Sequence, residues 1–281
     1  MKHAITLRVG PVAFRIGSDW RAPIAAIDAL YRDYPRAAFA DYTVRLEATA
    51  WWRRFVRPSI GIGGDYRLPE AAPLPLRHGL LAAELGMNLQ MALGHRRHLL
   101  LHASVVERDG RALLMSGVSG AGKSTLSLLL MRKGWRFLGD EFALIDPDSG
   151  LAFPFPRPIS LKNGSLAVIP DDSHKGPLLS GTPKGAIRHV APGAACLSMM
   201  GEPALPALLI FPRFGFPLET RGLMPAETFV RLTQASTNYV ALGEAGFRAM
   251  VRLRRSIPAI ALDYPDGPSG VAAVEALWSA L

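Results

Sequence analysis

One octapeptide near the middle of the chain constrains its fold more than any other segment. Residues 117–124 read Gly-Val-Ser-Gly-Ala-Gly-Lys-Ser and match the P-loop pattern G-x-x-x-x-G-K-[ST]. In such a loop, glycines let backbone N–H groups surround a phosphate, and the following helix adds the positive end of its dipole. Lys123 is then expected to reach the β- and γ-phosphates of a nucleotide, and the Ser124 hydroxyl to lie on Mg²⁺. The predicted nucleotide-binding residues are Gly117, Val118, Ser119, Gly120, Ala121, Gly122, Lys123, Ser124 and Thr125.

The residues on either side of this loop favour a strand–loop–helix unit. Residues 111–116 are mostly apolar and predict a short strand that enters the loop, and residues 124–133 predict a helix that leaves it. Arg132 and Lys133 would complement the dipole in the last turn of that helix, and Gly134 would end it. The alternative is a glycine-rich turn that carries Lys-Ser by chance, and the order of elements argues against it.

Length and composition bound the remaining possibilities. With 281 residues the chain can form one large domain or two small ones, and a hydrophobic content of 49% is ample for a core. The lone Cys196 excludes an intrachain disulfide and suits a reducing compartment. The N-terminus lacks the apolar run of a signal peptide, and no stretch is long and apolar enough to span a bilayer. We therefore expect a soluble, cytoplasmic protein with no membrane partner.

The chain is strongly basic, with a net charge of +9 and an isoelectric point of about 10.1. The arginines that carry most of this charge are scattered rather than clustered, which is typical of a solvated surface. No basic tail, zinc-ligand spacing or aromatic–basic motif accompanies them, so nucleic-acid binding is not favoured. Part of the charge is expected to line the phosphate site, and part to attract an acidic partner.

The periodicity of the chain predicts two units. Residues 1–75 are expected to form a small N-terminal α/β domain, which ends in the proline-rich link 68–75. Residues 76–281 are expected to form the nucleotide-binding domain, beginning with a helix over residues 76–93 that packs onto it. On that helix Arg77, His78 and Glu84 are most simply surface residues.

Several further elements are expected in the second unit. Residues 99–106 predict one strand, buried on both faces, which turns at Asp109-Gly110 into the strand of the loop as a hairpin. The polar, glycine- and proline-rich segment 171–185 predicts a loop. The other predicted strands cover residues 205–211 and 257–263, and the other predicted helices cover 225–235, 243–253 and 271–281.

Two acidic residues stand where phosphoryl-transfer chemistry needs them. Asp140 and Glu141 follow the strand that comes after the loop helix. A carboxylate at this place can handle a metal ion or take the proton of an attacking hydroxyl. Neighbours in a strand point to opposite sides unless the backbone turns there, so we assign the role of base to Asp140. The alternative is a turn-capping aspartate beside a solvated glutamate.

Other polar residues are weaker candidates for catalysis or for binding phosphate, base or substrate. His102 precedes the loop strand and is either catalytic or a core histidine. The cations Lys162, Lys184, Arg188 and Arg213 follow the loop and are candidates for binding phosphate or substrate, although each alone is typical of a solvated surface. The polar run 236–239, Ser-Thr-Asn-Tyr, is a candidate contact to the base or the substrate.

With these segments the chain resembles the HPr kinase/phosphorylase family, and more closely the HPr kinase-related type A kinases. The resemblance lies in Leu-His-Ala-Ser at 101–104, the P-loop itself, Gly-Asp-Glu at 139–141, and the segments 156–163 and 235–239. It covers roughly residues 90–265. The N-terminal unit resembles no family that we can name.

The resemblance implies an α/β fold: a P-loop kinase domain of the HPr kinase and phosphoenolpyruvate-carboxykinase type, with a mixed sheet, beside the small N-terminal α/β unit. It implies an ATP- and Mg²⁺-dependent kinase that phosphorylates a serine on a protein or ribosomally made peptide, and it hints at a homo-oligomer. The implied catalytic residues are Asp140, His102 and Lys123, and the implied metal-site residues are Ser124 and Glu141. The family commonly has aspartate where this chain has Glu141, which puts the reverse dephosphorylation in doubt.

Two alternatives stay open at this point. One is a kinase on the same fold that phosphorylates a small hydroxyl compound, which a closed small pocket would favour. The other is a nucleotide-binding regulatory protein with little catalysis, which an Asp140 directed away from the phosphates would favour.

Overall fold

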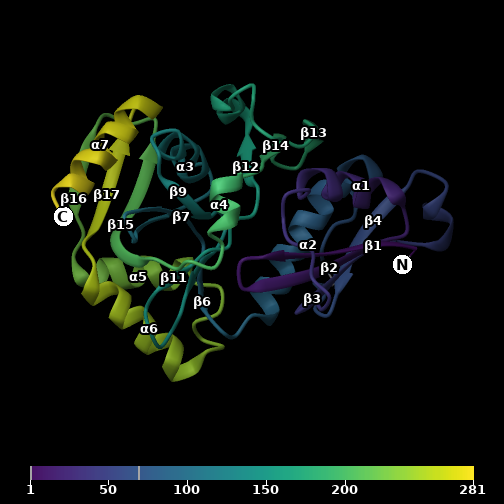
Figure 1. Cartoon of the computed structure of the whole chain (residues 1–281), viewed down its shortest axis with the longest axis horizontal. Coiled ribbons are helices and arrows are strands. Elements are labelled where there is room, and N and C mark those ends of the chain that lie inside the picture. Colours follow the sequence, from purple (N-terminus) through teal and green to yellow (C-terminus); the bar gives the residue numbers. More distant parts are fainter. Residues whose placement is uncertain (1, 69) are drawn as a thin grey trace.

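A computed structural model describes residues 2–68 and 70–281, so that the expectations touching Met1 and Pro69 lie outside the described residues. The molecule is elongated, and the N-terminal unit lies at one end of its long axis (Figure 1). A five-stranded sheet forms that unit, in the order β1-β2-β3-β4-β5. Its strands are β1 (His3–Val9), β2 (Val12–Ser18), β3 (Tyr42–Ala48), β4 (Ser59–Gly64) and β5 (Leu74–Pro75), with the 3₁₀ turn η1 (Trp51–Arg54) before β4.

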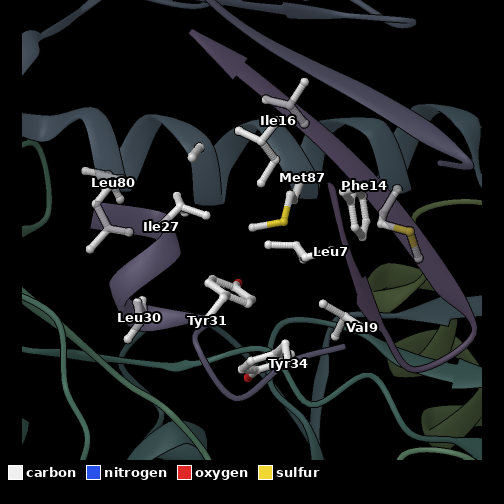
Figure 2. Packing of buried hydrophobic residues seen from close by; sticks show 14 of the residues in the cluster. Leu7, Val9, Phe14, Ile16, Ile27, Leu30, Tyr31, Tyr34, Leu80 and Met87 are labelled. Carbon is white, nitrogen blue, oxygen red and sulfur yellow. The ribbon is translucent and has the colours of Figure 1, made fainter. Parts of the chain in front are cut away.

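Two helices cover one face of this sheet and close its hydrophobic core. Helix α1 (Arg21–Leu30) connects the parallel strands β2 and β3, and helix α2 (Gly79–Gly94) follows the short turn η2 (Leu76–His78). Leu7, Phe14 and Ile16 from the strands meet Ile27 from α1 and Met87 from α2 in a fully buried cluster (Figure 2). Apolar residues every second position on the strands and every third or fourth on α1 supply this core.

Helix α2 corrects one of the expectations. It packs mainly against α1 and the strands β3 and β4 of the N-terminal unit, and it contacts the predicted second unit as well, through residues such as Phe155 in the same core cluster. Two of the three polar residues expected at its surface are buried, namely Glu84 and His78. Glu84 accepts a hydrogen bond from the Tyr31 hydroxyl and pairs with Arg157, and the His78 ring bonds to the carbonyl of Ser180. The division of the chain at 75/76 stays a prediction.

The second unit is built on a six-stranded mixed sheet, in the order β16-β17-β15-β8-β7-β9. Strand β15 is parallel to both β8 and β17, and the pairs β7–β8, β7–β9 and β16–β17 are antiparallel, which confirms the mixed sheet. The strands are β7 (Ala103–Arg108), β8 (Arg111–Ser116), β9 (Arg136–Gly139), β15 (Leu205–Phe214), β16 (Glu219–Gly222) and β17 (Ala259–Tyr264). The predicted hairpin turns at Asp109-Gly110, where both residues have positive φ.

Helices cover both faces of this sheet. Helices α3 (Lys123–Met131) and α7 (Gly267–Ser279) cover one face, where Leu113, Met115 and Leu126 are buried. Helices α5 (Pro225–Ala235) and α6 (Gly243–Ser256) cover the other, where Leu114 and Leu232 are buried. Leu113 and Leu114 are neighbours on β8 and face opposite cores, as a strand buried on both sides requires. No helix in the described part of the chain is both long and apolar enough to cross a membrane.

The strand predicted over residues 99–106 is two strands. Strand β6 (Leu99–Leu101) pairs with β10 (Ala143–Ile145) in a small sheet with β11 (Ala152–Phe153), whereas β7 belongs to the large sheet. The break falls at His102, whose N–H donates to the carbonyl of Ala235 instead of to a neighbouring strand. His102 is therefore not a core histidine, because its side chain is 40% exposed.

A third small sheet joins the two units at one end. It contains β12 (Ile159–Lys162), β13 (Leu179–Thr182) and β14 (Gly185–Val190), with η3 (Asn163–Val168) after β12 and α4 (Ala194–Ser198) after β14. The prediction of a loop over residues 171–185 is wrong for its second half, which forms β13 and the turn into β14. In Figure 1 this hairpin lies above the space between α3 and the N-terminal unit.

Candidate active site

Residues 117–124 form a turn that brings backbone donors to the N-terminus of α3. Gly117, Gly120 and Gly122 have φ values of 149°, 87° and 95°, which favour glycine. Gly122 is also enclosed, because a Cβ there would lie 2.0 Å from the Tyr264 hydroxyl oxygen. Among the described residues, no backbone carbonyl accepts from the N–H groups of residues 120 and 122–124. These N–H groups are free to bind an anion, as a helix N-terminus after a glycine loop does.

The Lys123 side chain folds back over this turn. Its Nζ donates to the carbonyls of Gly117, at 2.7 Å, and Val118, at 3.1 Å. The residue is only 8% exposed, and burial lowers the pKa of its ammonium against the opposing effect of the charges of Asp140 and Glu141. A bound phosphate would replace the two carbonyls as the acceptor for this cation.

Asp140 faces the start of α3. Its Oδ2 accepts a hydrogen bond of 2.8 Å from the Ser124 hydroxyl, and the residue is buried. Burial and the nearby charge of Glu141 raise the pKa of Asp140 above its ordinary value, while the hydrogen bond from Ser124 and the charge of Lys123 oppose that rise. Asp140 thus lies beside the predicted phosphate-binding turn and is held by the helix it faces.

Glu141 points toward the same cavity, because the backbone turns at this residue. Its φ of 76° departs from the strand conformation, so the side chains of Asp140 and Glu141 both line one space. The Oε2 of Glu141 lies 3.6 Å from Nδ1 of His102. Burial alone would raise the pKa of Glu141, but His102, Lys162 and other nearby cations outweigh it and lower that pKa.

A cavity of about 740 Å³ connects these groups, a size within the usual range for small-molecule sites. Of the predicted site residues it is lined by His102, Ser119, Gly120, Ala121, Gly122, Lys123, Ser124, Thr125, Asp140, Glu141, Lys162 and Lys184. Leu129, Val168 and Phe214 form an apolar part of its wall, which can accommodate a flat ring. The donors of the loop and this wall fit a nucleotide. The hydroxyl of Ser124 and the carboxylates of Asp140 and Glu141 are oxygen donors of the kind Mg²⁺ prefers.

The other predicted residues lie elsewhere. Gly117, Val118 and Arg213 line an adjoining cavity of about 1080 Å³, where Arg213 pairs with Asp263. This cavity shares His102 and residues 119–121 with the first. Arg188 lies on β14 and lines none of the cavities described here.

Asn238, within the polar run 236–239, is buried and holds the chain in place. Its amide donates to the carbonyls of His95 and His98, and its Oδ1 accepts from the N–H of Leu100. Ser236 and Thr237 line the 1080 Å³ cavity.

Four further side chains near the acids were not predicted as site residues, and one of them, Glu84, was expected at the surface. They are Glu84, Asn88, Arg157 and His189, which gather beside Asp140 and Glu141 in a smaller cavity. Glu84 and Asn88 lie on α2, far away in the sequence, and no local pattern marks them. The only signal was Arg157, a cation between two prolines in an otherwise apolar segment.

Comparison with known proteins adds little to this geometry. No protein-family model matches the chain, and a search of curated proteins finds no match. Among solved structures, the chain is similar to the Hpr(Ser) kinase/phosphatase from Coxiella burnetii, with 13% sequence identity over 65% of this chain and 99% of that chain. The TM-score is 0.27, too low for this similarity to support a fold or a function.

Proposed function

We propose that this chain is an ATP-dependent kinase that transfers the γ-phosphoryl group of ATP to a hydroxyl. The observation that carries the proposal is that a set of anion-binding donors and a carboxylate line the same cavity. On one side lie the free N–H groups of residues 120 and 122–124 together with Lys123. On the other side Asp140 bonds to Ser124 at 2.8 Å. Anion binding and a carboxylate base at such proximity are what phosphoryl transfer requires.

The loop N–H groups and Lys123 bind the phosphates and stabilise the negative charge on the transferred group. Asp140 orients the acceptor hydroxyl and takes its proton as the oxygen–phosphorus bond forms. The bond between the γ-phosphorus and its bridging oxygen breaks, and ADP leaves with the electron pair. Mg²⁺, held by Ser124 with Asp140 or Glu141, would neutralise charge on the phosphates.

The acceptor expected from the sequence is a serine on a protein or ribosomally made peptide. A second candidate is a small hydroxyl compound, and the small cavity of about 110 Å³ beside the acids favours it. A regulatory protein with little catalysis is the least favoured, because Asp140 lines the cavity that holds Lys123. Cytoplasmic location and assembly into a homo-oligomer stay predictions.

The test is an acceptor search. The chain is incubated with Mg²⁺ and γ-labelled ATP, together with peptides encoded beside its gene or with small hydroxyl compounds, and mass spectrometry locates the phosphate. Labelled acceptor formed by the parent and not by Lys123→Met supports the proposal. If the chain neither binds ATP nor consumes it under any of these conditions, the proposal is wrong.

A further inference from the structure

Large apolar side chains are exposed on one turn of the N-terminal unit. This aromatic turn, residues 51–57, lies in the connection between the antiparallel strands β3 and β4. Within it Trp51 is 83% exposed, Phe55 is 74% exposed and Val56 is 58% exposed, and Trp52 is exposed as well. A cluster of apolar side chains on the surface commonly marks a site of contact with a protein or a membrane.

Hydrogen bonds give the aromatic turn a fixed shape. The N–H of Phe55 donates to the carbonyl of Trp52 within the turn. The indole Nε1 of Trp20 donates to the carbonyl of Arg54 at 3.0 Å, and the Arg54 guanidinium donates to the carbonyl of Asp19 at 2.9 Å. The turn is therefore attached to the residues before α1, and a defined backbone holds its apolar side chains at the surface.

Arginines alternate with the apolar residues of this turn. They are Arg53, Arg54 and Arg57, and none of the three forms an ion pair with a carboxylate in the part of the chain that the structure describes. The sequence has no aspartate or glutamate from residue 48 to residue 64. The guanidinium carbon of Arg53 lies 4.3 Å from the centre of the Trp52 ring. The surface that fits this turn is therefore both apolar and negatively charged.

The shape of the aromatic turn favours a lipid surface over a folded partner. The turn connects two strands of a hairpin, and its residues line none of the cavities described above. A stable protein interface needs roughly 800 Å² on each side and a complementary shape. Lipids adapt instead to a small projection. Tryptophan prefers the boundary between headgroups and acyl chains, and basic side chains are attracted to anionic headgroups.

We propose that the aromatic turn inserts into the surface of a membrane that contains anionic lipids. Trp51, Phe55 and Val56 enter the region where headgroups meet acyl chains, and Arg53 and Arg57 bind the lipid phosphates. Such a contact needs no membrane-spanning helix. It replaces the expectation of no membrane partner, which rested on the lack of a spanning segment and a signal peptide. The inference does not depend on the proposed kinase activity.

The full chain is tested with vesicles of phosphatidylcholine that contain about 30% phosphatidylglycerol, and with vesicles of phosphatidylcholine alone. Sedimentation measures binding and tryptophan fluorescence reports insertion. Trp135 and Trp278 are buried and Trp20 is half-buried, so changes in emission come mainly from Trp51 and Trp52.

With the anionic vesicles we expect binding, a blue shift of the emission, and quenching by lipids that are brominated in the upper acyl chain. Binding to phosphatidylcholine alone is expected to be at least fivefold weaker. A chain that stays in the supernatant with anionic vesicles overturns the proposal. Sedimentation without quenching overturns it too, because the net charge of +9 alone could attract the chain to an anionic surface.

Two phenylalanines provide a matched pair of variants. Phe55→Ser is expected to weaken binding to the anionic vesicles at least fivefold. Phe39 is 87% exposed, lies between two alanines and belongs to another segment, so Phe39→Ser should stay within twofold of the parent. Equal binding by Phe55→Ser and the parent contradicts the proposal.

Two arginines separate a local charge effect from the overall charge. Arg57→Glu and Arg255→Glu, the latter at an exposed position of α6, change the net charge by the same amount. Arg57→Glu is expected to weaken vesicle binding at least threefold more than Arg255→Glu. Equal losses in the two variants would indicate attraction by the whole chain and would contradict insertion of the turn.

Two other classes of partner give distinct results. If the aromatic turn binds a second copy of the chain, the parent forms oligomers in sedimentation velocity that Phe55→Ser dissociates. If it stacks on single-stranded nucleic acid, the parent binds an oligothymidylate and Phe55→Ser does not. Either result in a chain that leaves the vesicles unbound overturns the membrane proposal. Neither result affects the kinase proposal, since the phosphoryl-transfer assay contains no vesicles.

Discussion

The Ser124 hydroxyl donates a 2.8 Å hydrogen bond to Oδ2 of Asp140. This bond joins the first turn of α3 to the residue that follows β9, 16 positions later in the sequence. It holds the carboxylate beside the turn in which the N–H groups of residues 120 and 122–124 donate to no backbone carbonyl of the described residues.

Lys123→Met is expected to weaken ATP binding at least tenfold and to abolish phosphoryl transfer. The reason is the loss of the only cation that the 117–124 turn itself carries. Lys133→Met, in the same segment but exposed beyond the end of α3, is the control and should behave as the parent. Calorimetric titration with ATP and a phosphate-transfer assay make the comparison. Full activity in Lys123→Met would remove the loop from the mechanism.

Gly122→Ala is expected to destabilise the chain more than Gly120→Ala. Both glycines have positive φ, so both substitutions carry backbone strain of about 1–3 kcal/mol. Only at Gly122 does the new Cβ collide, at 2.0 Å from the Tyr264 hydroxyl oxygen, whereas Gly120 has open space. Adding Tyr264→Phe should recover part of the loss at Gly122 and none at Gly120. Urea unfolding measures all four variants, and equal losses at the two glycines would contradict the packing described.

Elements that depend on neighbouring residues could be predicted from the sequence, whereas contacts between residues far apart in the sequence could not. The strand at 111–116 and the helix at 225–235 agree with their predicted bounds, because apolar periodicity and turn residues are local signals. The hairpin at Asp109-Gly110 was predictable for the same reason. In the candidate site, the loop residues and Asp140 were predicted to lie together because a single local unit, strand, loop, helix and next strand, contains them all.

Long-range packing was not predictable from such signals. Glu84 pairs with Arg157, 73 residues away in the sequence. The pattern of residues around Glu84 on its helix does not indicate this partner. The predicted strand divides in two at His102, because the N–H of this residue donates to the carbonyl of Ala235, in a distant segment. At Glu141 the backbone takes a positive φ, and this brings both acids to one cavity. No sequence pattern signals that conformation in a non-glycine residue.

Arg157→Met is expected to lower the free energy of unfolding by about 3–5 kcal/mol, because it leaves the buried Glu84 carboxylate without its cation. The double variant Glu84→Met/Arg157→Met should lose less, since no buried charge is left unpaired. Urea unfolding at neutral pH compares the parent, both single variants and the double variant. A loss below about 1 kcal/mol for Arg157→Met would show that the pair is not buried in solution.

Acid is expected to destabilise the chain through the buried pair His95 and His98, whose ring nitrogens lie 2.8 Å apart. Burial, together with the neighbouring His98, lowers the pKa of His95 to about 3 from its ordinary 6.5. Between these values the unfolded chain binds more protons than the folded chain, so stability falls as the pH falls. The expected loss is about 2 kcal/mol between pH 7 and pH 4.5.

Urea midpoints across this pH range provide the measurement. The double variant His95→Gln/His98→Gln should lose the part of the pH dependence that this pair contributes, whereas the part from buried His189, whose pKa burial also lowers, should remain. His3→Gln, on strand β1, should keep it. A parent whose midpoint does not change between pH 7 and pH 4.5 would contradict the buried, neutral state of the pair.

The central claim is that Asp140 acts on a hydroxyl beside a nucleotide bound at residues 117–124. The most direct measurement is the rate of γ-phosphate loss from labelled ATP by the parent and by Asp140→Asn, with the Kd for ATP determined in parallel. We predict a Kd that changes less than threefold and a rate that falls about a hundredfold or more, in keeping with the contribution of a general base. An Asp140→Asn protein that consumes ATP as fast as the parent would contradict the account.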